Sequence, residues 1–150
     1  MTEQTESTLV LIKPDAVERR LAGSIIRRFE SEGLRIDAIK MMWMDRAMAE
    51  RHYAEHEGEP FYGLLVDYII SGPIIAMVLS GPKAIKAVRD MIGNTDPQKA
   101  HPGTIRGQYA TKMPYNVVHA SDSKKSATRE ISLFFEPDEI MDYDAQSDKK

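Results

Sequence analysis

The six residues from Ile74 to Leu79 are almost wholly apolar, and this run constrains the possible folds more than any other stretch of the sequence. A short, continuous apolar segment of this length predicts a β-strand that is covered on both faces. A strand of that kind lies inside a packed sheet. The rest of the chain must therefore supply further strands and the helices that cover them.

Three other segments have the composition of strands. Thr8–Ile12 is a short apolar run of the kind that forms a buried strand, and it delivers Lys13 at its end. Between Leu34 and Met44 the apolar residues alternate and then slip by one position, which predicts a long strand with a bulge. Val117 and Val118 favour an extended backbone, so a fourth strand is expected there.

One long helix is expected after the first strand. Asp15 and the residue three positions later, Glu18, resemble a capping box that opens a helix, and Gly33 is placed to close it. Apolar residues recur every four positions between these signals, which is typical of an amphipathic helix. The periodic residues are Val17, Leu21, Ile25 and Phe29.

Four more helices are indicated by start and stop residues. Two of them are expected to contain a proline in or at their first turn, and two to begin after a capping side chain. The boundary residues are Asp45 for the first helix, Pro60 and Gly72 for the second, Pro82 and Gly93 for the third, and the stretch Ser121–Ser123 and Pro137 for the fourth.

The order of these elements predicts βαββαβ with insertions. Four strands with helices between them indicate an α/β (α+β) domain of the ferredoxin-like sandwich type, with a four-stranded antiparallel sheet covered by helices. A length of 150 residues with 42% hydrophobic content suits a single domain spanning residues 1–150. We expect its core at about residues 7–135 and a loose tail at about residues 143–150.

Charge and composition exclude several functions. A net charge of −3 gives no general attraction to nucleic acid or to an anionic membrane, so nucleic-acid binding is not favoured. The absence of cysteine excludes disulfides and thiolate metal sites and agrees with a reducing compartment. No signal peptide or membrane-spanning segment is apparent, so we expect a cytoplasmic protein without a membrane partner.

The segment NVVHASDS, residues 116–123, carries the most conspicuous candidate for chemistry. It places His119 after strand-forming valines and before Ser121, Asp122 and Ser123, which favour a turn and a helix N-cap. A neutral imidazole presented in this way is a competent nucleophile, and nearby hydroxyl or carboxylate groups could orient it. The alternative is a hydrogen-bonded histidine with a purely structural role, which is the more frequent case for an isolated residue.

Residues 93–115 form a long stretch rich in Gly, Pro, Asn, Asp and Thr, without periodicity. Such a stretch is either a disordered linker or a functional loop. It carries Thr95 and Arg106 and leads into the histidine strand, so an ordered loop that faces phosphate is favoured. Neither GxxxxGK[ST] nor GxGxxG occurs, and any phosphate recognition must therefore use side chains.

His52 and His56, four residues apart, could place two imidazoles on one metal ion. The sequence HYAEH differs from the HExxH metalloprotease motif because its glutamate is misplaced, and no third ligand is apparent. A metal-dependent hydrolase is therefore a weaker hypothesis. A nucleotide-sensing or nucleic-acid-binding regulatory module without turnover is another alternative, and the acidic net charge argues against it.

Three motifs together, KPDAV near the start, HPGTIRG, and NVVHASDS, resemble the nucleoside diphosphate kinase family. The resemblance runs from about Ser7 to Phe135, with the motifs in the same order and spacing. It implies a ferredoxin-like fold and an enzyme in which His119 accepts the γ-phosphoryl group of a nucleoside triphosphate and passes it to a nucleoside diphosphate. It also implies Mg²⁺ that arrives with the nucleotide, with Asp122 acting on it through water.

The resemblance assigns roles to single residues. The implied catalytic residues are His119, Lys13, Tyr53, Arg89, Arg106, Ser121 and Glu130. The implied nucleotide contacts are Lys13, Tyr53, His56, Phe61, Leu65, Arg89, Thr95, Arg106, Met113 and Asn116. Among these, Phe61, Leu65 and Met113 would form apolar walls for the base, and low base selectivity is expected.

The resemblance further implies a homo-oligomer, expected as a hexamer built from dimers. Ala16 and Ala120 stand where many family members have glycine, which is a small change. Pro114 and Tyr115 stand where many have glycine and arginine, and this departure concerns the geometry of the loop beside the base.

Overall fold

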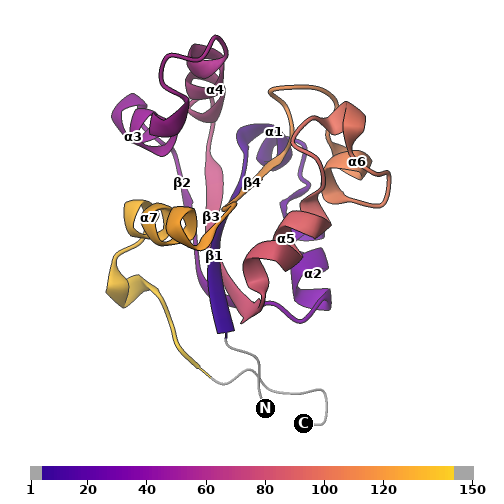
Figure 1. Cartoon of the computed structure of the whole chain (residues 1–150), viewed down its shortest axis with the longest axis vertical. Coiled ribbons are helices and arrows are strands. Elements are labelled where there is room, and N and C mark those ends of the chain that lie inside the picture. The colour runs from indigo at the N-terminus through magenta and orange to yellow at the C-terminus, as the bar shows by residue number, and fades with distance from the viewer. Residues whose placement is uncertain (1–4, 144–150) are drawn as a thin grey trace.

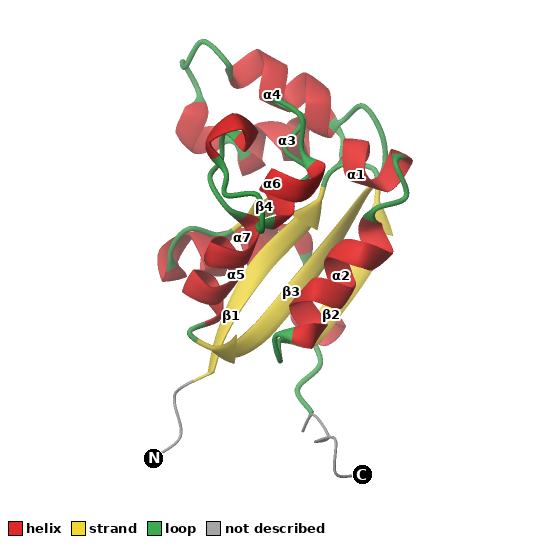
Figure 2. Ribbon diagram, turned by 90° about the vertical axis from the view of Figure 1, so that its right-hand side faces the viewer, coloured by secondary structure: helices red, strands yellow, loops and turns green. Residues whose placement is uncertain are grey.

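A computed structural model describes residues 5–143. Its sheet has four strands in the order β2-β3-β1-β4, and every neighbouring pair is antiparallel (Figures 1 and 2). The predicted four-stranded antiparallel sheet is therefore confirmed. The strands are β1 (Thr5–Ile12), β2 (Arg35–Met42), β3 (Ile74–Pro82) and β4 (Val118–Ala120).

Helices cover both faces of this sheet, as the apolar sequence of β3 predicts; Figure 1 shows α7 on one side of the strands and α2 and α5 on the other. The α-helices are α1 (Pro14–Glu18), α2 (Ala22–Ser31), α3 (Arg46–His52), α4 (Tyr62–Ile69), α5 (Ala84–Ile92), α6 (Ile105–Tyr109) and α7 (Lys124–Phe134). The 3₁₀ turns are η1 (Ala54–His56), η2 (Pro97–Lys99) and η3 (Pro137–Glu139).

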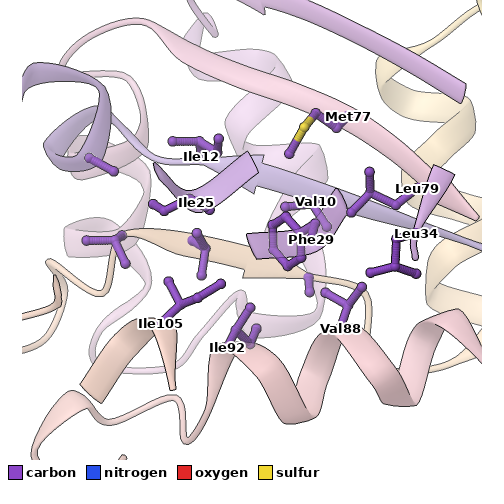
Figure 3. Close-up of a cluster of buried hydrophobic side chains, with 14 of the residues drawn as sticks. Val10, Ile12, Ile25, Phe29, Leu34, Met77, Leu79, Val88, Ile92 and Ile105 are labelled. Carbon is purple, nitrogen blue, oxygen red and sulfur yellow. The ribbon is translucent and has the colours of Figure 1, made fainter. Parts of the chain in front are cut away.

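Two hydrophobic cores result, one on each face. The first is formed by α1, α2, α5 and α6 against the sheet, with Phe29 surrounded by Val10, Leu79 and Val88 (Figure 3). The second packs α3, α4 and α7 against the opposite face, where alternate residues of β1 such as Leu9 point. Successive side chains of a strand point to opposite faces, so an almost wholly apolar strand contributes to both cores.

The prediction of a single helix between Asp15 and Gly33 is wrong, because the structure has two helices there, α1 and α2. Arg20 adopts a left-handed conformation (φ 61°), and the helix is interrupted there. The capping box is also wrong. Pro14 is in the first helical turn and Lys13 is the N-cap, so Asp15 lies inside the helix and cannot cap it.

Two prolines mark boundaries less closely than expected. Pro60 lies in the turn before α4, which begins at Tyr62. Pro82 is the last residue of β3, and α5 begins two residues later, after Lys83 in a left-handed conformation. An element end is the least determined part of a pattern-based prediction, because proline is compatible with both a strand end and a helix start.

The stretch 93–115 is ordered and contains η2 and α6, which the sequence did not indicate. Thr104 caps α6 by accepting a hydrogen bond from the backbone N–H of Gly107 (3.0 Å). A Cβ at Gly107 would collide with the carbonyl oxygen of His101, so the close approach of these two backbones requires glycine. With only five residues, α6 is too short to show helical periodicity.

Other local predictions are confirmed. The register of β2 against β3 shifts between Ile36 and Ala38, where the bulge was expected. Asp45 caps α3, Ser123 is the member of the expected stretch Ser121–Ser123 that caps α7, and Gly93 follows α5 with φ 88°. The expected loose tail lies outside the described residues, except for its first residue. Within residues 5–143, no helix is both long and apolar enough to span a bilayer.

Candidate active site

A hollow of about 320 Å³ opens beside the end of β1 and the short strand β4. Helices α3, α4, α5 and α7, and the stretch that contains α6, supply the rest of its wall. All but one of the predicted site residues line it. They are Lys13, Tyr53, His56, Phe61, Leu65, Arg89, Thr95, Arg106, Met113, Asn116, His119, Asp122 and Glu130. The exception, Ser121, is fully buried behind the wall.

His119 is held from behind by a carboxylate. Its Nε2 lies 3.0 Å from Oε1 of Glu130, and the same oxygen accepts a hydrogen bond from the hydroxyl of Ser121 (2.8 Å). Ser121 is fixed in turn by the backbone N–H of Leu9, which donates to its Oγ (3.1 Å). The chain of contacts runs from β1 through Ser121 and Glu130 to the imidazole.

Glu130 is ionised in this arrangement. Burial acts to raise the pKa of its carboxyl group, but the hydrogen bond and charge of His119 and the hydroxyl of Ser121 outweigh burial, and the pKa lies below its ordinary value. An ionised carboxylate accepts hydrogen bonds, so Nε2 of His119 carries the proton. The lone pair is then on Nδ1, the ring nitrogen that Glu130 does not engage.

The residue before this strand breaks the expected extended pattern. Val117 has φ 61°, and the N–H of Val118 donates to the carbonyl of Asn116 (2.7 Å), which closes a γ-turn. The extended backbone expected at Val117 is therefore wrong. A positive φ is unfavourable for a β-branched residue, so surrounding contacts must hold the turn.

Arg106 supplies those contacts. Its guanidinium donates to three carbonyl oxygens, those of Asn116 (3.3 Å), Val118 (2.8 Å) and Gly93 (3.0 Å). Burial, followed by the nearby charge of Arg89, lowers its pKa to about 10, and it remains charged at neutral pH. A guanidinium has five N–H donors, so two are left for a ligand in the hollow.

Lys13 ends β1 and reaches the same hollow. Its Nζ donates to Oδ1 of Asn116 (2.8 Å), and the amide of Asn116 donates to the carbonyl of Thr95 (3.1 Å). Only 4% of Lys13 is exposed. Burial and then the charge of Arg106 lower its pKa to about 7. The hollow therefore contains a lysine that a phosphate group would restore to its charged form.

Four polar atoms of the residues that line the hollow have no hydrogen-bond partner among the described residues. They are the hydroxyl of Tyr53, both ring nitrogens of His52 and Nε of Arg129. Burial raises the pKa of Tyr53, so its hydroxyl stays protonated and can donate a hydrogen bond. Burial also lowers the pKa of His52 well below its ordinary value, which keeps that imidazole neutral.

The mouth of the hollow is apolar. Phe61 and Met113 are each about 40% exposed, and the buried Leu65 lies with them in the wall. His56 packs against Phe61 with ring centroids 5.5 Å apart. Tyr115, one of the two residues that depart from the family pattern, packs edge-on against Tyr68 and lines a neighbouring hollow instead.

Five lining residues were not predicted: His52, Glu55, Ala120, Ser126 and Arg129. Ser126 lies four positions before Glu130 on α7, so helical spacing from Glu130 would have indicated it, whereas the adjacent Arg129 could not be inferred in this way. His52 and His56 do not form a pair. Helix α3 ends at His52, which is buried beside His119, whereas His56 is partly exposed and contacts Glu59.

This arrangement combines basic groups that suit phosphate, an apolar mouth that suits a flat ring, and an imidazole whose free nitrogen is nucleophilic. The basic side chains are Lys13, Arg89, Arg106 and Arg129. On a ferredoxin-like sheet, such a pocket is typical of an enzyme that transfers phosphoryl groups between nucleotides.

The chain belongs to the nucleoside diphosphate kinase family, whose model matches residues 6–140. A nucleoside diphosphate kinase of Pyrococcus furiosus is 56% identical over 143 residues, which are 93% of this chain and 89% of the relative. One of Methanocaldococcus jannaschii is 56% identical over 137 residues, covering 91% of this chain and 98% of the relative. As a member of this family the chain is a phosphotransferase.

Solved structures agree. A halophilic nucleoside diphosphate kinase from Halobacterium salinarum in complex with CDP superposes with a TM-score of 0.93, at 46% identity and with 95% of each chain covered. A transition-state mimic of the enzyme from Borrelia burgdorferi with bound vanadate and ADP gives a TM-score of 0.89 at 35% identity, with 94% of this chain and 93% of that one covered.

Proposed function

We propose that this enzyme transfers the γ-phosphoryl group of a nucleoside triphosphate to a nucleoside diphosphate in two half-reactions, through a phosphohistidine on His119. The observation that carries this proposal is the contact between Nε2 of His119 and the ionised Glu130. It leaves Nδ1 unprotonated on a side chain that lines the hollow. A nucleophile of this kind requires no separate base, because it has no proton to lose.

In the first half-reaction, the lone pair of Nδ1 forms a bond to the γ-phosphorus. The bond between that phosphorus and the β,γ-bridging oxygen breaks, and the nucleoside diphosphate leaves with the electron pair. The imidazole ring becomes positively charged as the new bond forms, and the carboxylate of Glu130 stabilises that charge at Nε2. The second half-reaction is the same step in reverse, with a different diphosphate as acceptor.

The side chains of the hollow can be arranged along a nucleotide. Cations and donors would contact the phosphates, Asn116 the sugar, and the apolar mouth the base. The solved relatives with bound CDP and with bound ADP and vanadate support the binding of a nucleotide by this family. The phosphate contacts we propose are Lys13, Tyr53, His56, Arg89, Thr95 and Arg106, and the base contacts are Phe61, Leu65 and Met113.

Magnesium would enter with the nucleotide. The hydrogen bond of Ser126, with help from Arg89, lowers the pKa of Asp122, so this lining residue is ionised. Glu130 is already engaged by His119 and Ser121. Mg²⁺ requires six oxygen ligands, and these carboxylates alone cannot supply them. These residues therefore fit a Mg²⁺ ion that is held mainly by the phosphates and that Asp122 contacts through water. The ion would neutralise phosphate charge.

The direct test is incubation of the enzyme with labelled ATP and Mg²⁺ in the absence of an acceptor. We expect one phosphoryl group per chain by mass measurement, with ADP released in equal amount and ping-pong kinetics in the steady state. The modification should be labile in acid and stable in base, as a phosphoramidate is. Incorporation that survives acid would contradict the proposal.

Base selectivity should be low, because the mouth provides stacking and apolar contact without a set of donors and acceptors matched to one base edge. ATP and CTP should donate with kcat/KM values within about a thousandfold of each other. The measurement that tests this is kcat/KM for each of the four common nucleoside triphosphates as donor, with one and the same acceptor. A larger difference would reveal directed polar recognition of the base.

We also propose a homo-oligomer, expected as a hexamer built from dimers, in which β2 contributes an interface. β2 lies at the edge of the sheet, and Ile39 and Met41 near its end and Trp43 directly after it are 50%, 60% and 64% exposed. An exposed apolar edge of this kind is a ready interface between copies.

Met41→Lys should therefore reduce the molecular mass measured by light scattering at micromolar concentration. Leu64→Lys, at an equally exposed apolar residue on α4, is the matched control and should leave the mass unchanged. A wild-type monomer would refute oligomerisation, and a tetramer would refute only the hexamer.

The remaining expectations are a single domain and a cytoplasmic location. Both hydrophobic cores pack on one sheet, which supports one cooperative unit. The absence of cysteine supports a reducing compartment. Limited proteolysis that separates two stable fragments, or fractionation that places the protein elsewhere, would contradict them.

A further inference from the structure

His52 has no evident role in phosphoryl transfer, yet it is buried at the base of the catalytic hollow. It ends α3, is 3% exposed, and packs against the rings of Tyr53, Phe134 and His119. Neither of its ring nitrogens has a hydrogen-bond partner among the described residues. Buried polar groups are nearly always paired, so this imidazole requires an explanation.

Two side chains near His52, those of His119 and Glu130, are of types that can ligate a metal ion. The ring centroid of His52 is 4.6 Å from that of His119. One ligand atom from each of His52, His119 and Glu130 can be chosen so that all three lie within 4.8 Å of one another. Two imidazoles and a carboxylate are a ligand set that Zn²⁺ uses in proteins, with a fourth position left for water.

We infer that His52, His119 and Glu130 form a binding site for a borderline divalent cation, Zn²⁺, distinct from the Mg²⁺ that accompanies the nucleotide. Tetrahedral Zn²⁺ with bonds of about 2.1 Å separates its ligand atoms by about 3.4 Å, so the largest separation must shorten by about 1.4 Å. The side chain of His119 is 22% exposed and can rotate to close that gap. The exposed part of the His119 side chain borders the hollow, which leaves room for this rotation. Mg²⁺ prefers oxygen ligands and does not compete for this set.

Binding of Zn²⁺ changes the tautomer of His119. The ion takes the place of the proton between Nε2 and Glu130, and that proton moves to Nδ1. A neutral imidazole keeps its single proton, so no proton is released. Nδ1 then has no lone pair for phosphorus. This inhibitory consequence rests on the proposed phosphohistidine mechanism, whereas the metal binding does not.

The binding is tested with Zn²⁺ alone, by calorimetric titration of metal-free enzyme without nucleotide. We expect one ion per chain with a dissociation constant in the micromolar range or below. His52→Phe should weaken binding at least about 100-fold, because loss of an outer partner alone can cost that much. His101→Phe, at an exposed histidine in the loop before α6, is the matched control and should bind as the wild type does. Equal binding by His52→Phe, or no binding by the wild type, would overturn the site.

Two measurements on the wild type remain decisive if His52→Phe fails to fold. Co²⁺ in place of Zn²⁺ should give the strong visible absorption of tetrahedral coordination, and a weak octahedral spectrum would overturn the site. Nitrogen NMR of His119 should show the proton on Nδ1 when Zn²⁺ is bound, and an unchanged tautomer would overturn the inhibitory mechanism.

Pre-incubation with Zn²⁺ should then prevent phosphorylation by ATP and Mg²⁺, and a chelator should restore it. Full phosphorylation of the Zn²⁺-bound enzyme would overturn inhibition. If the metal-free enzyme is not phosphorylated either, the proposed function fails, and the calorimetric result for the metal site stands by itself.

Discussion

His119→Ala should lower the rate of phosphoryl transfer by about 100,000-fold or more, the order of loss seen when a catalytic nucleophile is removed. No neighbouring group can replace it. The hydroxyl of Ser121 is fully buried and hydrogen-bonded to Glu130. The nitrogens of His52 are buried as well. The measurements are incorporation of label from ATP and a coupled assay with an acceptor diphosphate.

His101→Ala provides the control for this experiment, since it removes an exposed histidine outside the hollow and should leave both measurements unchanged. Label retained by His119→Ala at the wild-type level would show that another residue is the nucleophile. The reaction would then have to be assigned again, starting from the residues that line the hollow.

Lys13→Gln should have two large and opposite effects. Loss of the buried charge should lower kcat/KM by about 100- to 1,000-fold, the usual result when one preorganised group that stabilises a developing phosphoryl charge is removed. The variant should nevertheless unfold at a higher temperature at pH 6. Glutamine can still donate a hydrogen bond to Asn116. It also avoids the free-energy cost of burying an ammonium group, the cost that lowers the pKa of Lys13 from 10.5 to about 7.

The pH dependence of this stabilisation follows from the direction of the shift. Below pH 7 the lysine is charged in both the folded and unfolded states, and the folded wild type bears the whole cost of burial. Between pH 7 and 10.5 the unfolded chain binds more protons than the folded one, so the free energy of unfolding of the wild type rises with pH. The advantage of Lys13→Gln should therefore shrink towards pH 10.

Thermal unfolding of both proteins at pH 6 and pH 9 measures the effect. Lys86→Gln is the control, because Lys86 is an exposed lysine that pairs with Asp90 and should not change kinetics or its pH profile. A Lys13→Gln variant that is less stable than the wild type at both pH values would mean that the buried charge is compensated by contacts other than Asn116.

Much of the site was predictable because its signals are local or repeat a family pattern. His119, Ser121 and Ser123 lie within one segment of eight residues, and strand, turn and helix cap follow from their side chains. The bulge in β2 was visible as a slip in the alternation of apolar residues. In both segments the local propensities of the residues and their tertiary environment favour the same conformation.

The parts that were missed depend on contacts between distant residues. The break at Arg20 leaves the four-residue apolar spacing unchanged, so periodicity cannot detect it. His52 and Arg129 reach the hollow only because α3 and α7 pack on the same face of the sheet. The positive φ of Val117 contradicts its own preference and is imposed from outside, by Arg106.

The γ-turn at Val117 has a consequence for protein engineering. The segment NVVHASDS is not a portable cassette, because its backbone is shaped by a guanidinium 10 to 12 residues earlier in the chain. Transplanting the octapeptide into another antiparallel sheet would let Val117 relax to an extended conformation, which would alter the path of the chain into His119. A functional graft would have to include residues 93–123 as one piece, together with a strand that donates a backbone N–H to the carbonyl of Val117, as Lys13 does here.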